Sequence, residues 1–165
     1  MDANELKARQ TPLKDRYRVA PGDAVLTLHA TGDLGEGVAC SVVTGRAIVE
    51  AGLHPATGGS GLQACSGDML LQALAACAGV TMKSVATSMG IAVAGTVHAD
   101  GDLDFRGTLG VDKEAPVGFT DIRLSFELVS DASAEQLATL IRLTERYCVV
   151  FQTLAIPPVL AVSVA

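Results

Sequence analysis

Two cysteines are the residues of this chain that could do chemistry. Cys77 lies in the apolar run Ala-Leu-Ala-Ala-Cys-Ala-Gly, and Cys148 lies in Tyr-Cys-Val-Val. A thiolate is a nucleophile that attacks hydroperoxides and disulfides, whereas a buried thiol behaves as a small hydrophobic side chain. Each cysteine alone is therefore open to both interpretations.

The surroundings of Cys77 indicate what a reactive thiol would need. The pattern predicts a helix from Asp68 to about Met89, with Ser66 as the N-cap and Gly90 as the stop. Its first half is apolar nearly all round, which predicts a buried helix wrapped by a sheet or by a second subunit. A mid-helix position does not lower a thiol pKa, so a reactive Cys77 would need a nearby cation, most simply an arginine.

The segments around this helix alternate in polarity and predict strands. Before the helix these are Val25–Ala30, Val38–Val43 and Ala47–Ala51, with a turn at Gly32–Gly37 and a loop at Gly52–Gly67. After the helix, strands are expected at Ile91–Phe105, Thr120–Val129 and Val159–Val164, and Gly107–Gly118 is expected to be a connection.

A second helix is expected before the final strand. It opens at the capping box Ser133 to Gln136 and continues to Cys148. This order of strands and helices is typical of an α+β fold. Residues 1–24 are charged, contain two prolines and show little periodicity, so we expect an N-terminal arm followed by a single domain at 25–165.

Composition and charge exclude several classes of function. The net charge of −6 argues against a nucleic-acid partner, because phosphate binding needs clustered Lys and Arg. No signal segment is visible, and the uncharged apolar stretch Met69–Met82 is too short to span a bilayer, so a cytoplasmic protein is expected. His29, His54 and His98 lack metal-ligand spacing, and we expect neither a metal nor a bound cofactor.

The two cysteine segments together resemble the OsmC/Ohr family. Asp68-Met-Leu-Leu-Gln-Ala-Leu-Ala-Ala-Cys77 is similar to the central-helix signature of these proteins, and Tyr147-Cys148-Val149-Val150 is similar to their Cys-Pro-Val motif. The segment Gly101-Asp-Leu-Asp resembles the middle region of the family. The resemblance covers about Val25 to Val164.

The resemblance implies a fold and an activity. The fold is an intertwined homodimer with strongly curved antiparallel sheets wrapped around central helices. Cys77 would attack an organic hydroperoxide and become a sulfenic acid, and Cys148 would resolve it as a disulfide. An external dithiol, which in family members can be lipoyl-type, would restore the pair, and an Arg and an acidic residue would support the thiolate.

The sequence departs from the family pattern in three places. Val149 replaces the Pro of Cys-Pro-Val, and Gly67 stands where peroxidase members carry Glu, which leaves Asp68 as the nearest carboxylate. Asp68 is equally well explained as a helix-start residue. Arg46, in a turn that resembles the family's Gly-Arg turn, is the first choice for the activating cation, and Arg16 and Arg18 compete with it.

Three functions follow from these features. The first is a thiol-dependent peroxidase; the second is a non-catalytic protein of the same fold that binds a small hydrophobic ligand; the third is a slow redox sensor. Cys65, in the loop before the helix, could resolve a Cys77 sulfenic acid or could be a bystander, and Cys40 is expected in the core.

Overall fold

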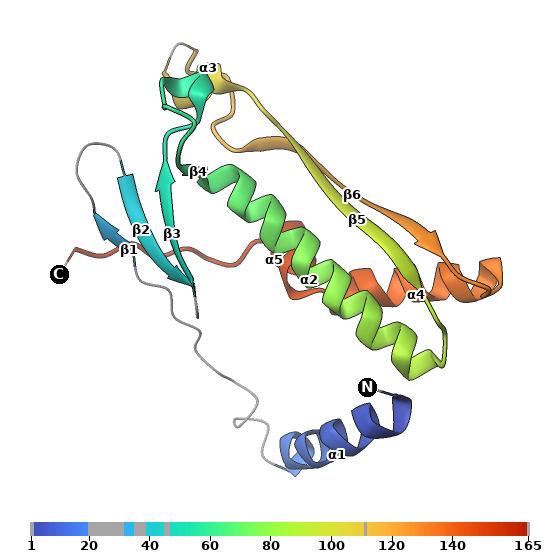
Figure 1. Ribbon diagram of the computed structural model, residues 1–165. Coiled ribbons are helices and arrows are strands. Elements are labelled where there is room, and N and C mark those ends of the chain that lie inside the picture. The colour runs from blue at the N-terminus through green and yellow to red at the C-terminus, as the bar shows by residue number, and fades with distance from the viewer. Residues whose placement is uncertain (1, 20–31, 35–38, 45–46, 111, 165) are drawn as a thin grey trace. The chain divides into compact units, whose positions relative to one another are not determined.

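The computed structural model describes residues 2–19, 32–34, 39–44, 47–110 and 112–164, without the side chains of residues 9, 12–18, 32–34, 39–44, 47 and 48 (Figure 1). The chain forms two compact units. The first unit comprises residues 1–15, 73–98 and 125–165, and the second comprises residues 16–72 and 99–124. Two helices and two long strands each continue from one unit into the other, and each unit is described by itself.

The second unit contains a four-stranded sheet in the order β1-β2-β3-β4. Its strands are β1 (Gly32–Leu34), β2 (Ala39–Thr44), β3 (Ala47–Gly52) and β4 (Ala64–Cys65). The β1–β2 and β2–β3 pairs are antiparallel, whereas β3 and β4 are parallel. The α+β class is confirmed, with this parallel pair as an exception to the antiparallel sheets that we expected.

Three strands were expected in this region, and two of them are confirmed. Strands β2 and β3 lie where alternation predicts them, with Val42 opposite Val49. The expected turn at Gly32–Gly37 is wrong at its start, because residues 32–34 form strand β1 by pairing with β2. The expected strand Val25–Ala30 lies outside the described residues.

The loop between β3 and β4 is ordered by local hydrogen bonds. A 3-10 turn, η2, covers Pro55–Thr57, and His54 Nδ1 accepts a 3.0 Å hydrogen bond from the backbone N–H of Ala56. The His54 ring also stacks on Phe105 with 5.0 Å between ring centroids. His54 therefore has a structural role in shaping this loop.

Helix α2 (Ser66–Met89) is the long helix that carries Cys77. It begins at Ser66, two residues before the predicted start, so Ser66 is the first helical residue rather than the N-cap. It ends as expected, because Gly90 adopts the left-handed φ of 69° and the N–H of Ile91 donates to the carbonyl of Ala86 at 2.9 Å.

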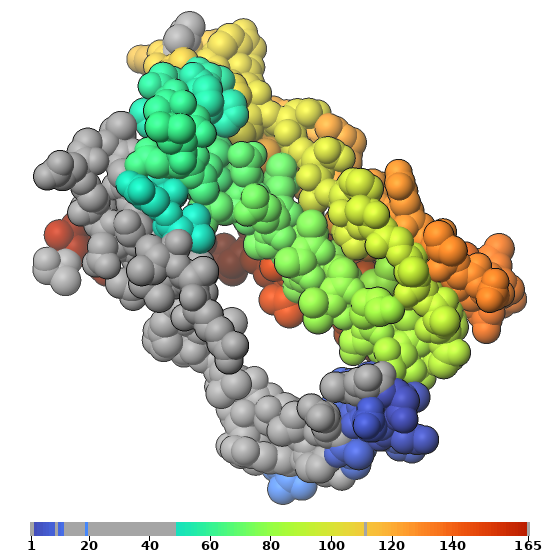
Figure 2. Space-filling view, in the orientation of Figure 1, coloured from blue at the N-terminus to red at the C-terminus, as the bar shows by residue number. Residues whose placement is uncertain are grey.

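The burial of α2 differs from the expectation. Four residues spaced by one turn are buried, namely Leu74, Ala78, Met82 and Ala86. The other faces are half-buried or exposed in the single chain, and Val80 is 73% exposed. The surface of this helix, green in Figure 2, is visible along most of its length. The single chain therefore buries one stripe of α2, and the expectation that a second subunit wraps the rest of this helix stays a prediction.

Helix α2 is also long and apolar enough, among the helices in the described part of the chain, to cross a membrane by length and composition. A helix in the core of a water-soluble protein meets the same criterion, and the uncharged run within α2 is short because Lys83 interrupts it.

Strands β5 (Ala94–Leu103) and β6 (Phe119–Val129) pair as a two-stranded sheet, and the connection between them includes the helical turn α3 (Phe105–Thr108). The close approach of the strands requires glycine at Gly95. Its φ is 133°, and a Cβ there would lie 1.9 Å from the carbonyl oxygen of Glu127. Both strand predictions are confirmed, with β5 shorter than expected at both ends.

Three further helices belong wholly or mainly to the first unit: α1 (Ala3–Val19), α4 (Ala134–Tyr147) and α5 (Val149–Ala155). The capping box of α4 is confirmed, since the N–H of Gln136 donates to Ser133 Oγ at 3.2 Å and the N–H of Ser133 donates to Gln136 Oε1 at 2.9 Å. The core of the unit is an aliphatic cluster of buried residues: Met82, Ala86, Val93 and Leu140.

Both ends of the chain differ from the sequence expectation. The N-terminal arm contains helix α1, although its residues show little amphipathic periodicity. The final strand Val159–Val164 is wrong for the single chain, because these residues have no regular structure and no described strand pairs with them. A strand needs a neighbouring edge, and alternation in the sequence does not supply one.

Candidate active site around Cys77 and Cys148

Cys77 lies near the middle of helix α2 and is half-buried. Its neighbour Ala78 is completely buried, which places Cys77 at the edge of the stripe that packs into the first unit. One turn further along the helix, the hydroxyl of Thr81 hydrogen-bonds to the Cys77 sulfur. The residue is thus close to the core but within reach of solvent.

Cys148 lies at the junction between helices α4 and α5 and has no exposed surface. It continues the buried stripe Leu140, Thr144 and Cys148, whose members are separated by one helical turn. Its N–H donates to the carbonyl of Thr144, and its carbonyl accepts from the N–H of Gln152, both at 2.9 Å. Cys148 is therefore both the C-cap of α4 and the N-cap of α5.

The structure brings the two thiols into hydrogen-bond contact. Burial raises the pKa of the Cys77 thiol, but hydrogen bonds from the N–H of Val150, the Cys148 thiol, the N–H of Val149 and the Thr81 hydroxyl outweigh burial and lower this pKa below its ordinary value. Burial and the neighbouring Cys77 sulfur raise the pKa of Cys148. In this pair the Cys148 thiol donates a hydrogen bond to the Cys77 sulfur, which favours ionisation of Cys77 over ionisation of Cys148.

Among the residues that the structure describes, the hydrogen bonds that lower the pKa of Cys77 include two from backbone N–H groups, those of Val149 and Val150. Val149 and Val150 are the first two residues of α5, and the first N–H groups of a helix have no partner within it. Here they point at the sulfur of a residue on α2. Backbone N–H groups at the start of another helix can therefore lower the pKa of a thiol in the middle of a helix, an effect that we expected only from a cation.

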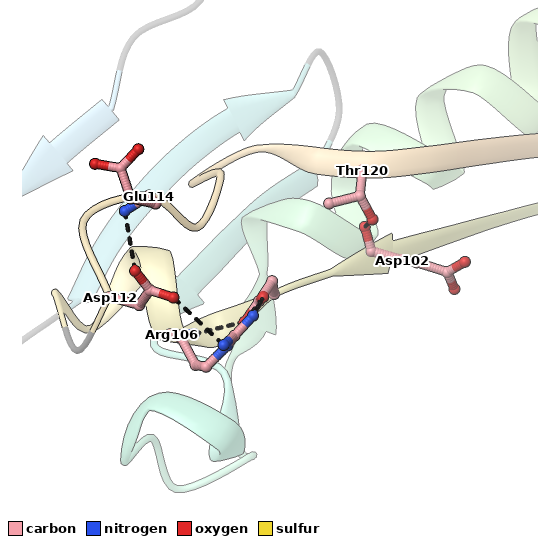
Figure 3. Close-up of polar contacts among 6 residues, drawn as sticks. Asp102, Arg106, Asp112, Glu114 and Thr120 are labelled. Atoms are coloured by element: carbon pink, nitrogen blue, oxygen red, sulfur yellow. Dashed lines mark hydrogen bonds and ion pairs between the residues drawn. The ribbon is translucent and has the colours of Figure 1, made fainter.

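The arginine candidates are distributed as follows. Arg46 lies outside the described residues, and the side chains of Arg16 and Arg18 on α1 are not described, so the choice of activating arginine stays a prediction. In the second unit, the guanidinium of Arg106 forms ion pairs with the carboxylates of Asp104 and Asp112 (Figure 3). The distance from Arg106 Nη1 to Asp112 Oδ2 is 3.3 Å.

Arg123 is held in a similar way, between the carboxylates of Asp102 and Asp121. Asp102 also connects to the neighbouring strand, because its carbonyl accepts a 3.0 Å hydrogen bond from Thr120 Oγ1 (Figure 3). Both Arg106 and Arg123 are therefore committed to ion pairs within the second unit.

Asp68 lies in the first turn of α2, where the helix dipole stabilises a carboxylate. Nine residues of helix rise by about 14 Å, and the groups that act on the pKa of Cys77 do not include Asp68. Its proposed support of the thiolate stays a prediction, and the helix-start interpretation accounts for its position.

The remaining candidates lie elsewhere. Cys65, in strand β4 of the second unit, is half-buried and free, and Cys40 lies in β2 with its side chain not described. His98 on β5 has its Nε2 atom 3.9 Å from Oε2 of Glu127. His29 is outside the described residues. Within the described ranges no group of His, Cys, Asp and Glu could hold a metal ion.

The arrangement of α2, the β5–β6 hairpin and the α4–α5 pair is that of the OsmC-like class of α+β proteins. The sequence model described as OsmC-like protein matches residues 59–163. The chain belongs to this family. No match is found among curated proteins.

Solved structures agree on the fold. An OsmC-like protein from Mycoplasma pneumoniae is similar with a TM-score of 0.67 and 18% identity, covering 80% of this chain and 89% of that one. An OsmC-like protein from Vibrio cholerae is similar with a TM-score of 0.63 and 15% identity, and the match covers 78% of this chain and 94% of that one. The organic hydroperoxide resistance protein OhrB of Bacillus subtilis is similar with a TM-score of 0.51 and 16% identity, and the match covers 80% of this chain and 93% of that one.

Sequence reasoning missed two parts of the site. Helix α5 was not expected, because Val149, Val150 and Phe151 have high strand propensity. Thr81 was also missed, although its spacing of four residues from Cys77 on a predicted helix is a signal that could have found it.

Proposed function

We propose that this chain reduces organic hydroperoxides, with Cys77 as the peroxidatic thiol and Cys148 as the resolving thiol. The observation that carries the proposal is the hydrogen-bonded thiol pair, in which the pKa of Cys77 is lowered and that of Cys148 is raised. A nucleophilic thiolate beside a protonated partner is the starting state that peroxide reduction requires.

The chemistry proceeds in two balanced steps. The Cys77 thiolate attacks the outer oxygen of the hydroperoxide, the O–O bond breaks, and the leaving alkoxide takes a proton to become an alcohol. Cys77 is then a sulfenic acid. Cys148 loses its proton and attacks the Cys77 sulfur, a disulfide forms, and the hydroxyl group leaves as water. A dithiol supplies two electrons and two protons to restore both thiols.

The proposed partners are a second copy of the chain and an external dithiol. Proteins of this family are typically dimers. Apolar residues at the C-terminus are almost fully exposed in the single chain, including Val159 and Val164 at 99% each. Such exposure of consecutive apolar residues marks an interaction surface and supports a dimer. We also place the protein in the cytoplasm, where a thiol reductant is at hand.

The first test is a thiol count after reaction with cumene hydroperoxide. Reduced protein is treated with a small excess, and free thiols, intact mass and the peptide map are measured. We expect the loss of two thiols and a crosslink between the peptides of Cys77 and Cys148. Cys65→Ser is the matched control and should react as the wild type does.

Single variants separate the two roles. Cys77→Ser should lose the reaction altogether, whereas Cys148→Ser should stop at a sulfenic acid that dimedone traps on Cys77. Unreacted thiols in the wild-type protein would refute the peroxidase proposal and leave a ligand-binding protein. Disulfide formation without sustained turnover on added dithiol would indicate a redox sensor instead.

A further inference from the structure

The described groups that hydrogen-bond to the Cys77 sulfur come from two parts of the first unit. The junction of α4 and α5 supplies the Cys148 thiol and the N–H groups of Val149 and Val150. The fourth group is the hydroxyl of Thr81, which lies on α2 itself, one turn after Cys77. Thr81 is therefore the one described donor that does not come from the junction that carries the resolving thiol.

The Thr81 hydroxyl is used differently from that of Thr87, further along the same helix. A helical threonine commonly donates to the backbone carbonyl four residues earlier. Thr87 donates in this way to the carbonyl of Lys83 at 2.7 Å. Thr81 has the same spacing of four residues from Cys77, but its hydroxyl hydrogen-bonds to the side-chain sulfur. It thus contacts the atom that reacts in the proposed function.

Thr81 also lines a surface cavity of the first unit, formed by residues of α1, α2 and α4. The volume of the cavity is about 580 Å³, which is ample for a small molecule and for water. Ser84, Ser88 and Tyr147 add further hydroxyl groups to its wall, and none of the described residues that line it is charged. The cavity therefore gives small neutral molecules a route to the hydroxyl beside Cys77.

The two steps of the proposed reaction restrict where the transferred oxygen lies. The oxygen bonds to the Cys77 sulfur on the side from which the hydroperoxide approaches. In the second step Cys148 attacks the same sulfur in line with the S–O bond that breaks, and so from the side away from the oxygen. The oxygen therefore points away from the α4–α5 junction, where Thr81 is the described donor that remains to contact it.

We propose that Thr81 is a catalytic residue, whose hydroxyl hydrogen-bonds to the oxygen of the Cys77 sulfenic acid on the side of the cavity. The inference rests on the peroxidase proposal and deepens it by adding a residue and a direction of approach. When Cys148 attacks, the S–S bond forms, the S–O bond breaks, and the leaving oxygen takes up the proton that Cys148 releases, so that water leaves. The hydrogen bond from Thr81 stabilises the negative charge that develops on this oxygen.

A simpler account is that the Thr81 hydroxyl acts only on the thiol before the reaction, by lowering the pKa of Cys77. Loss of the hydroxyl would then slow the formation of the sulfenic acid and leave its conversion to the disulfide unchanged. In the proposed role the conversion itself becomes slower. The two accounts therefore differ in whether the sulfenic acid accumulates.

The test is a single-turnover reaction of the reduced full chain with cumene hydroperoxide, with dimedone added at a series of times. Mass spectrometry measures the dimedone adduct of Cys77 and the Cys77–Cys148 disulfide separately. Thr81→Val removes the hydroxyl and keeps the shape, so it should slow disulfide formation about tenfold and increase the adduct. Thr81→Ser retains the hydroxyl and should restore the behaviour of the wild type.

Thr87→Val is the matched control, because it makes the same change on the same helix at a residue that does not line the cavity. It should react as the wild type does. A second measurement needs no peroxide. Iodoacetamide labelling of Cys77 at neutral pH should be slower in Thr81→Val, but not in Thr81→Ser or Thr87→Val, because a hydrogen bond to the thiolate is lost only in the first variant.

Three results would overturn the inference and leave the peroxidase proposal standing. Disulfide formation at the wild-type rate in Thr81→Val would show that the hydroxyl has no role. Equal slowing in Thr81→Val and Thr81→Ser would indicate a requirement for the shape of threonine. Slower sulfenic acid formation without accumulation of the adduct would reduce Thr81 to its effect on the pKa of Cys77. A wild-type chain that does not react with the hydroperoxide would instead refute the peroxidase proposal, and the inference with it.

Discussion

At the scale of the residue, the site consists of two sulfur atoms whose surroundings move their pKa values in opposite directions. Cys77 receives hydrogen bonds from two backbone N–H groups, a thiol and a hydroxyl, whereas Cys148 is fully buried beside the charge that develops on Cys77. Because a hydrogen bond joins the two sulfur atoms, ionisation of one thiol disfavours ionisation of the other.

The first prediction concerns pH. Because the pKa of Cys77 is lowered, its thiolate fraction should reach a plateau at a lower pH than that of an ordinary thiol, and Cys148 should need a higher pH. Iodoacetamide labelling at a series of pH values, read by peptide mass spectrometry, checks this order. Unfolded protein in denaturant is the control, and there the two cysteines should label alike. Faster labelling of Cys148 at neutral pH would contradict the assignment.

The second prediction uses the replacement of the family's proline. Val149→Pro removes one N–H donor to Cys77, while the first helical position and the extended backbone of Cys148 (φ −73°, ψ 108°) both tolerate proline. We expect the pKa of Cys77 to rise and its labelling at neutral pH to slow by about two- to tenfold.

Val149→Ala is the control for this variant, because it removes the side chain but retains the N–H. It should label at the wild-type rate. Equal slowing in both variants would show that the side chain of Val149, and not its backbone donor, affects the thiol.

At the scale of the element, two local features hold the site. Helix α4 carries Leu140 and Thr144 into the core and ends at Cys148, so the stability of its start affects where Cys148 lies. The β5–β6 hairpin packs Phe126 and Leu128 against the same core cluster.

The third prediction is for the start of α4. Ser133→Ala removes the oxygen that accepts from the N–H of Gln136 and should lower the free energy of unfolding by about 1 kcal/mol. Urea unfolding measures the change. Ser163→Ala, in the exposed extended segment, should have no measurable effect. An unchanged midpoint for Ser133→Ala would mean that the capping box is not formed in solution.

The fourth prediction is for the hairpin. Gly95→Ala places a Cβ against the carbonyl of Glu127 at a φ that alanine rarely adopts, so we expect a loss of at least about 1–3 kcal/mol in unfolding free energy. Gly118→Ala has open space around its Cβ and should be close to neutral. Thermal unfolding of both variants compares them, and equal melting temperatures would argue against the close strand approach at Gly95.

At the scale of the whole molecule, exposed apolar surface is the main observation. Helix α2 buries only one stripe, and Val162 and Val164 in the last segment are 96% and 99% exposed. A second copy that covers these surfaces could give the last segment a strand partner, which no described strand of the single chain provides.

The fifth prediction follows from this exposure. Val162→Asp should leave the fold of one chain intact, since the side chain touches little within it, but should weaken a dimer that buries it by about ten- to a hundredfold in Kd. Sedimentation at several concentrations measures the association. Ser163→Asp adds the same charge to the neighbouring residue and should have a smaller effect. A monomeric wild type would refute the dimer.

The sequence alone determined those elements whose signals are local. Helix α2 and its glycine stop, the capping box of α4, and strands β2, β3, β5 and β6 could all be predicted, because periodicity and capping act between residues a few positions apart. The identity of the two candidate cysteines also came from the sequence, through the motifs that resemble the OsmC/Ohr family.

Tertiary structure alone decided what surrounds those cysteines. Cys77 contacts Cys148 and the N–H donors at the start of α5, and these segments are about 70 residues apart in the chain. The expected strand at the C-terminus failed for the same reason. Hydrogen bonds to a sulfur atom or to a strand edge depend on which segments contact each other in the folded chain. Local residue patterns do not predict those contacts.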